Sequence, residues 1–72
     1  MCTFHSDKEV QVCDVAIPHV KAQLAADADA IRFTHLEGEG TLVQAVGDID
    51  PAVFERRVRS GMAAAEASEV AP

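Results

Sequence analysis

Apolar and polar residues alternate along three short stretches of the chain, and a period of two residues is typical of half-buried strands. Between the second and third stretches, Gly38 and Gly40 can adopt the positive φ angles of a tight connection. The pattern therefore predicts one early strand and, later in the chain, an antiparallel hairpin. The predicted strands are residues 9–13 (EVQVC), 30–36 (AIRFTHL) and 41–46 (TLVQAV).

Between the first strand and the hairpin, the apolar residues change to a helical spacing. Ile17, Val20, Leu24 and Ala28 are separated by three, four and four positions. Pro18 fits only near the start of such a helix, where its missing N–H is not needed. The spacing predicts a helix of about three turns.

A second helix is predicted after the hairpin. Asp50 is a good N-cap, and Pro51 suits the first helical position because its φ is already fixed. Phe54, Val58 and Met62 form the apolar stripe of this helix. Gly61 is compatible with either the end of the helix or a tolerated interior position.

The predicted order of elements is βαββα, which indicates an α+β two-layer sandwich with both helices on one face of the sheet. If the first strand lies between or beside the hairpin strands, the arrangement resembles a ferredoxin-like fold without its last strand. We expect an N-terminal arm (1–8), one domain (9–62) and an Ala-rich C-terminal tail or helix extension (63–72). A missing last strand would leave an open sheet edge that can dock a partner.

The length of the chain limits the functions open to it. A domain of 72 residues can bury only about 60% of its surface, and a substrate cleft of roughly 300 Å³ would hollow out its single core. The sequence also contains no P-loop and no dinucleotide-binding fingerprint. We therefore expect a protein that is not an enzyme and that uses no cofactor.

Charge narrows the choice of partners. The net charge is -6, and the chain contains no Trp or Tyr to stack on bases, so direct binding to nucleic acid or to an anionic membrane is not expected. There is no signal-peptide pattern and no apolar run long enough to span a bilayer. Two cysteines do not make the dense framework of small secreted domains, so we expect reduced thiols and a cytoplasmic protein.

A metal-binding carrier is one alternative function. Its candidate ligands are Cys2, His5, Cys13 and His19, of types that suit zinc or copper. The expected topology resembles the ferredoxin-like heavy-metal-associated domains, which carry Cys-x-x-Cys at the junction of the first strand and helix. This chain has Cys13 and His19 there, with five residues between them, so the resemblance is one of topology and not of metal ligands. We expect His35, on the same strand side as Phe33, to be a partly buried, hydrogen-bonded imidazole.

Acidic residues are the leading candidates for partner binding. Six of them fall between residues 27 and 50 beside the single cation Arg32, and all are predicted to lie in loops. Such carboxylates could engage Lys and Arg of a basic protein surface, including that of a nucleic-acid-binding complex, and block it. The candidate residues are Asp27, Asp29, Glu37, Glu39, Asp48 and Asp50.

In size, acidity and lack of a catalytic apparatus, the chain resembles the small acidic inhibitors of phages and mobile elements, including anti-CRISPR proteins. The resemblance implies an inhibitor that occupies a nucleic-acid-binding surface of a defence complex. An antitoxin-like regulatory subunit is a further alternative, because the acidic balance permits it equally.

Overall fold

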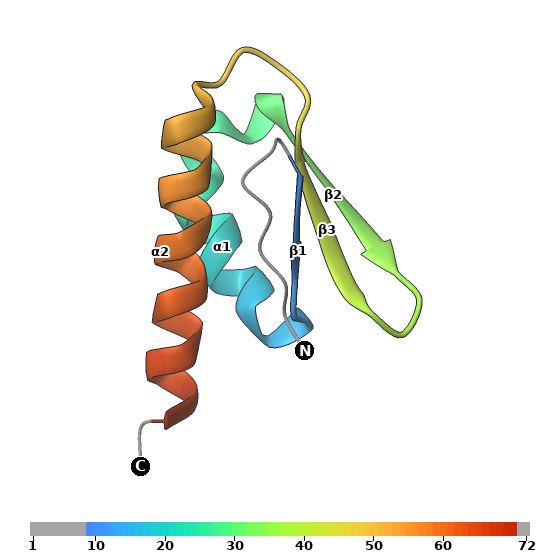
Figure 1. Ribbon diagram of the computed structural model, residues 1–72, viewed down its shortest axis with the longest axis vertical. Coiled ribbons are helices and arrows are strands. Elements are labelled where there is room, and N and C mark those ends of the chain that lie inside the picture. The colour runs from blue at the N-terminus through green and yellow to red at the C-terminus, as the bar shows by residue number, and fades with distance from the viewer. Residues whose placement is uncertain (1–8, 71–72) are drawn as a thin grey trace.

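The computed structural model describes the backbone of residues 9–70 and the side chains of residues 9–68 (Figure 1). Two helices lie side by side on one face of a three-stranded sheet, which confirms the predicted α+β class. The elements in order are β1 (Glu9–Val12), η1 (Asp14–Ala16), α1 (Ile17–Leu24), η2 (Ala25–Ala30), β2 (Ile31–Leu36), β3 (Gly40–Ala45) and α2 (Pro51–Val70), where η marks a 3-10 helix.

The sheet has the strand order β1-β3-β2, and both pairs of neighbours are antiparallel. Val43 at the centre of β3 is opposite Val10 of β1 and Phe33 of β2. Because β1 lies beside the second strand of the hairpin, the arrangement is the predicted ferredoxin-like one without a last strand.

Alternation along the strands places the core between the sheet and the helices. Val10, Val12 and Val43 are completely buried, whereas Glu9 and Arg32, which point to the other face, are exposed. The helices contribute large apolar side chains to the same core. The buried apolar residues are Val10, Val12, Ala16, Val20, Leu24, Ile31, Val43, Phe54, Val58 and Ala65.

The first helix is shorter than its spacing predicts. α1 ends at Leu24, and the chain continues as the 3-10 segment η2, within which Asp27 has a non-helical φ of -117°. Ala28, predicted to extend the apolar stripe, is exposed. A methyl group contributes little burial energy compared with Leu24, so nothing holds another α-helical turn against the sheet.

The hairpin turn uses its two glycines as predicted. Gly38 has a φ of 75° and Gly40 a φ of 95°, both in the left-handed region that disfavours other residues. A side chain at Gly40 would also collide with the carbonyl oxygen of Val12. The end of β1 and the start of β3 are therefore in close contact.

The second helix begins as predicted and runs on through the Ala-rich segment to Val70. The Asp50 carboxylate accepts a hydrogen bond from the Ala52 N–H at 2.9 Å, which caps the helix. Within the part of the chain that the structure describes, no helix has both the length and the apolar character needed to cross a bilayer.

Gly61 is an interior glycine of α2, which settles the question that the sequence leaves open. A Cβ atom at Gly61 would lie 2.6 Å from the Cα atom of Val20 in α1. The two helices approach so closely here that only hydrogen fits between their backbones.

We expect Gly61→Ala to destabilise the protein by about 1–3 kcal/mol, because overpacking at the helix contact outweighs the higher helix propensity of Ala. The measurement is the free energy of unfolding from denaturant titration. Ser60→Ala, at an exposed position of the same helix, is the control and should leave stability unchanged or raise it slightly. A Gly61→Ala protein as stable as wild type would contradict the close contact.

Candidate functional site

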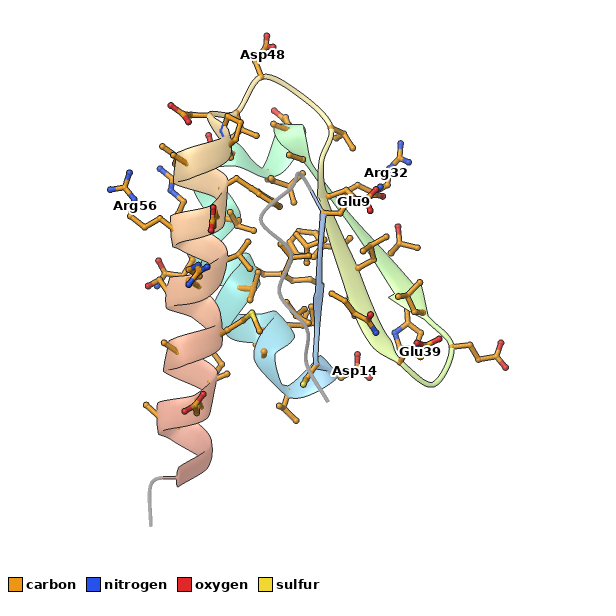
Figure 2. All side chains as sticks on the ribbon, viewed as in Figure 1. Glu9, Asp14, Arg32, Glu39, Asp48 and Arg56 are labelled. Carbon is orange, nitrogen blue, oxygen red and sulfur yellow. The ribbon has the colours of Figure 1, made fainter. Side chains whose placement is uncertain are left out.

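The hairpin topology separates the candidate acidic residues into two groups at opposite ends of the sheet. Glu37 and Glu39 lie in the turn between β2 and β3, whereas Asp29 precedes β2 and Asp48 follows β3. Figure 2 shows Glu39 and Asp48 at opposite ends of the strands. Six-residue strands separate these ends by about 20 Å, more than two Debye lengths at physiological salt. The two groups therefore act as separate surfaces.

At the hairpin end, the fold adds a third carboxylate to Glu37 and Glu39. Asp14 follows β1, and its Oδ1 accepts a hydrogen bond from the Thr41 hydroxyl at 3.2 Å. All three acidic residues are exposed, and Asp14 and Glu39 lie toward the same end of the molecule in Figure 2. We call Asp14, Glu37 and Glu39 the acidic hairpin end.

Side-chain hydrogen bonds to the hairpin fix its position relative to β1. The Gln11 amide donates to the Glu39 carbonyl oxygen at 2.6 Å, and the bond from Thr41 ties the start of β3 to Asp14. The turn that carries Glu37 and Glu39 is thus anchored to a neighbouring strand.

His35 differs from its prediction. Its side chain is 69% exposed, and Nδ1 lies 3.7 Å from the Asp14 Oδ1 atom, which is too long for a hydrogen bond. The alternation does place His35 in register with Thr41, on the side of the sheet that faces the helices. The hairpin end, however, extends away from the helices in Figure 1, so the ring is not covered.

At the opposite end, two of the four candidates have roles within the fold. The Asp27 carboxylate forms a partly buried ion pair with the Arg57 guanidinium, which links η2 to α2. Asp50 caps α2. Asp29 and Asp48 are exposed, and the backbone segments that carry them meet, since the N–H groups of Val46 and Gly47 both donate to the Ala30 carbonyl.

Arg57 and Arg59 of α2 and Lys21 of α1 have partners within the protein. Besides the pair formed by Arg57, Arg59 donates to Glu55 at 3.2 Å one turn away. The Lys21 ammonium of α1 lies 5.4 Å from the centroid of the Phe33 ring. Arg57 and Arg59 therefore balance acids of the same layer, whereas Arg56 is exposed.

The expectation of reduced cysteines is wrong for Cys13, which is disulfide-bonded. Its sulfur is consequently not a thiolate ligand. His19 lies half-buried in α1, and the other two proposed ligands, Cys2 and His5, fall outside the described residues. Among residues 9–70, no group of three or more His, Cys, Asp or Glu side chains is placed to hold a metal ion.

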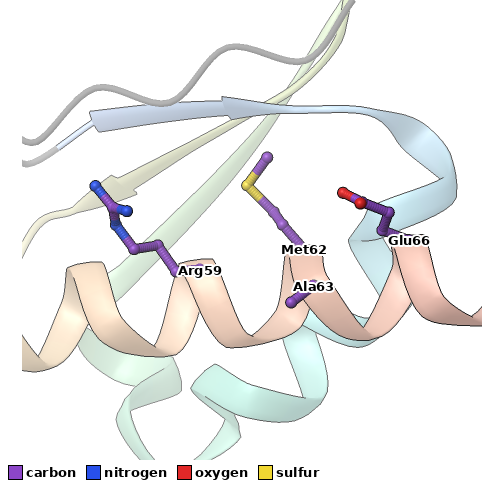
Figure 3. A pocket seen from close by; sticks show the side chains of 4 residues that line it. All are labelled: Arg59, Met62, Ala63 and Glu66. Carbon is purple, nitrogen blue, oxygen red and sulfur yellow. The ribbon is translucent and has the colours of Figure 1, made fainter.

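A hollow of about 370 Å³ lies on α2, lined by Arg59, Met62, Ala63 and Glu66 (Figure 3). The side chains of Arg59, Met62 and Glu66 project from the helix toward the side on which β1 lies. The hollow is open to solvent, and its lining combines the cation Arg59, the anion Glu66 and the half-buried thioether of Met62.

Comparison with known proteins finds no matching family model, no matching curated protein and no matching solved structure.

Asp14 is the member of the acidic hairpin end that sequence reasoning missed. In the sequence it lies just after the first predicted strand, far from Glu37 and Glu39. The signal that could have found it is the pairing of β1 with β3, which places Val12 opposite Thr41 and so brings Asp14 to the hairpin.

We expect Asp27→Asn to lower the free energy of unfolding by about 1 kcal/mol, because it removes a charge-assisted hydrogen bond that solvent partly screens. Asp29→Asn makes the same chemical change at an exposed position two residues away, and it should change stability by less than about 0.5 kcal/mol. Thermal and denaturant unfolding of both variants measure the difference. Equal effects would show that the Arg57 contact contributes nothing specific.

Proposed function

We propose that the protein is a non-enzymatic binding module whose acidic hairpin end engages a basic surface of a partner protein. The observation that supports this most is the gathering of Asp14, Glu37 and Glu39, from two separate segments, at one end of the sheet. The arginine ion pairs Arg57–Asp27 and Arg59–Glu55 both involve α2 and leave this end acidic.

The hydrogen bonds that connect the hairpin to β1 and Asp14 support the choice of this end over the other. Carboxylates on an anchored turn lose little conformational freedom on binding, so more of their attraction to Lys and Arg contributes to affinity. At the opposite end, Asp27 and Asp50 already have partners inside the fold, which leaves Asp29 and Asp48. Those two residues make the weaker candidate surface.

The chemistry of the partner follows from that of the site. Exposed carboxylates on a projecting turn resemble, in charge, the phosphates that a nucleic-acid-binding surface recognises with Lys and Arg. The partner we propose is a nucleic-acid-binding complex, and the module would block its basic surface, as an anti-CRISPR-like inhibitor does. One interface of standard size buries about 800 Å² per partner, so such a contact would occupy much of this small molecule.

The test compares two charge-reversal variants in capture from lysate of the native host. One carries Glu37→Lys and Glu39→Lys, and the other carries Asp29→Lys and Asp48→Lys, with the same change of net charge at the other end of the sheet. We expect wild type and the second variant to capture the same complex in a salt-sensitive way. The hairpin variant should lose at least about tenfold in affinity, because like charges then face each other.

A functional readout must accompany capture. Saturating wild-type protein should displace nucleic acid from the captured complex, and the hairpin variant should not. Undiminished capture by the hairpin variant would falsify the proposed site, and nucleic-acid binding that is insensitive to wild-type protein would refute the blocking role. Capture of a single regulatory or toxin subunit would instead support the antitoxin-like alternative.

The cytoplasm stays the proposed location, but the argument from reduced thiols no longer supports it, because Cys13 is disulfide-bonded and disulfides are typical of oxidising compartments. Because Cys13 is disulfide-bonded in the structure, the capture experiment should be run both with and without a reductant.

A further inference from the structure

The outer edge of β2 carries backbone groups that the sheet does not use. β2 pairs with β3 on one side, and within the described part of the chain no strand pairs with its other side. The Val46 N–H donates to the Ala30 carbonyl, which points the backbone of Ala30 toward β3. Backbone groups alternate in direction along a strand, so the N–H and C=O groups of Ile31, Phe33 and His35 point outward. An edge of this kind is a template for a further strand.

Two cations flank this edge, one on each face of the sheet. Arg32 is exposed and projects from the face that points away from the helices, as Figure 2 shows. On the other face, the Lys21 ammonium lies 5.4 Å from the ring centroid of Phe33, the next residue of β2. The strand itself contains no Asp or Glu. In a protein whose net charge is -6, the β2 edge is therefore locally basic.

Neither cation is neutralised by a neighbouring carboxylate. Within residues 9–68, whose side chains are described, neither Arg32 nor Lys21 forms an ion pair. Glu9 lies in the same cross-strand row as Arg32, but it is two strands away and accepts a hydrogen bond from the Gln44 amide at 3.0 Å. Both cations are therefore available to the carboxylates of a partner.

The positions of the two cations define the charge pattern of a strand that fits this edge. Residues that are opposite each other in paired strands project from the same face of the sheet. A residue opposite Arg32 would lie beside the guanidinium, and a residue opposite Phe33 would face the Lys21 ammonium. These two positions are consecutive in the incoming strand, so two adjacent Asp or Glu residues would satisfy both cations.

We propose that the outer edge of β2 binds an extended acidic segment of a partner protein, whose two consecutive carboxylates pair with Arg32 and Lys21. The outward backbone groups of β2 hold the main chain of this segment, and the cations select its side chains. A second copy of this chain fits less well, because pairing β2 with another β2 would bring like cations to one edge and join two molecules of net charge -6. The inference does not depend on the acidic hairpin end.

The test is titration of the isotope-labelled full chain with short peptides, followed by NMR. The probe is Thr-Val-Glu-Glu-Val-Thr, which reads the same in both directions and can pair in either orientation; its controls carry Gln-Gln or Lys-Lys at the centre. We expect the Glu-Glu peptide to bind about tenfold more tightly than the Gln-Gln peptide. It should shift the amide resonances of Ile31, Phe33 and His35, whereas those of β1, at the far edge of the sheet, should not move.

Two pairs of variants separate the charge from the backbone pairing. Arg32→Glu should weaken binding of the Glu-Glu peptide about tenfold, whereas Arg56→Glu, the same change at an exposed position of α2, should alter it by less than about twofold. His35→Pro removes an outward N–H and no hydrogen bond to β3, so it should abolish binding while the sheet stays intact. His35→Ala keeps that N–H and should bind like wild type.

Four results would overturn the proposal. The first is an affinity of wild type for the Glu-Glu peptide no higher than for the Lys-Lys peptide, a measurement that needs no variant. The second is a set of amide shifts at β1 in place of β2. The third is equal binding by folded His35→Pro and His35→Ala, which would show that the peptide does not pair with the edge. The fourth is a shift of the β2 amides on dilution without peptide, because a second copy would then occupy the edge.

Discussion

The contact between α1 and α2 at Gly61 determines how the helix layer covers the sheet. A Cβ atom at this position would lie only 2.6 Å from the Val20 Cα atom, so the two backbones can approach only because Gly61 has no side chain. This approach lets Val20, Phe54 and Val58 reach one continuous core over a sheet of three strands. It also places the start of α2 beside η2, where Arg57 meets Asp27. A wider separation of the helices would weaken the packing and the ion pair together.

Much of the fold could be predicted from the sequence because periodicity, turn chemistry and capping agree with one another. The three strands, the glycine turn and the Asp50 cap follow from local rules that tertiary structure does not override here. The errors occur where the apolar spacing of a helix or the alternation of a strand continues past the region in which the helices and the sheet pack against each other. Ala28 keeps the helical spacing but has too little side chain to hold the helix. His35 keeps the strand alternation but lies where the helices no longer cover the sheet.

The candidate site was predictable only in part, because it depends on which strand lies beside which. The sequence locates Glu37 and Glu39 in a turn, and the hairpin alone implies that Asp29 and Asp48 lie at the opposite end. It does not reveal that β1 pairs with β3, so it cannot bring Asp14 to the hairpin. The sequence did not predict the ion pair of Asp27 either, because Asp27 and Arg57 are 30 positions apart and only tertiary packing brings η2 and α2 together.

The acidity of the hairpin end follows from how the two layers divide the charged residues. Arg57 and Arg59 are carried by a helix whose neighbours include Asp27 and Glu55, so their charge is balanced within the helix layer. The turns of the sheet contain no Lys or Arg, because residues 37–40 and 46–50 have only acidic, small or apolar side chains. Since about 20 Å and more than two Debye lengths separate the ends, the helix cations near one end do little to screen the carboxylates at the other. A chain whose net charge is modest in total can therefore present a locally strong negative field without any motif that marks it in the sequence.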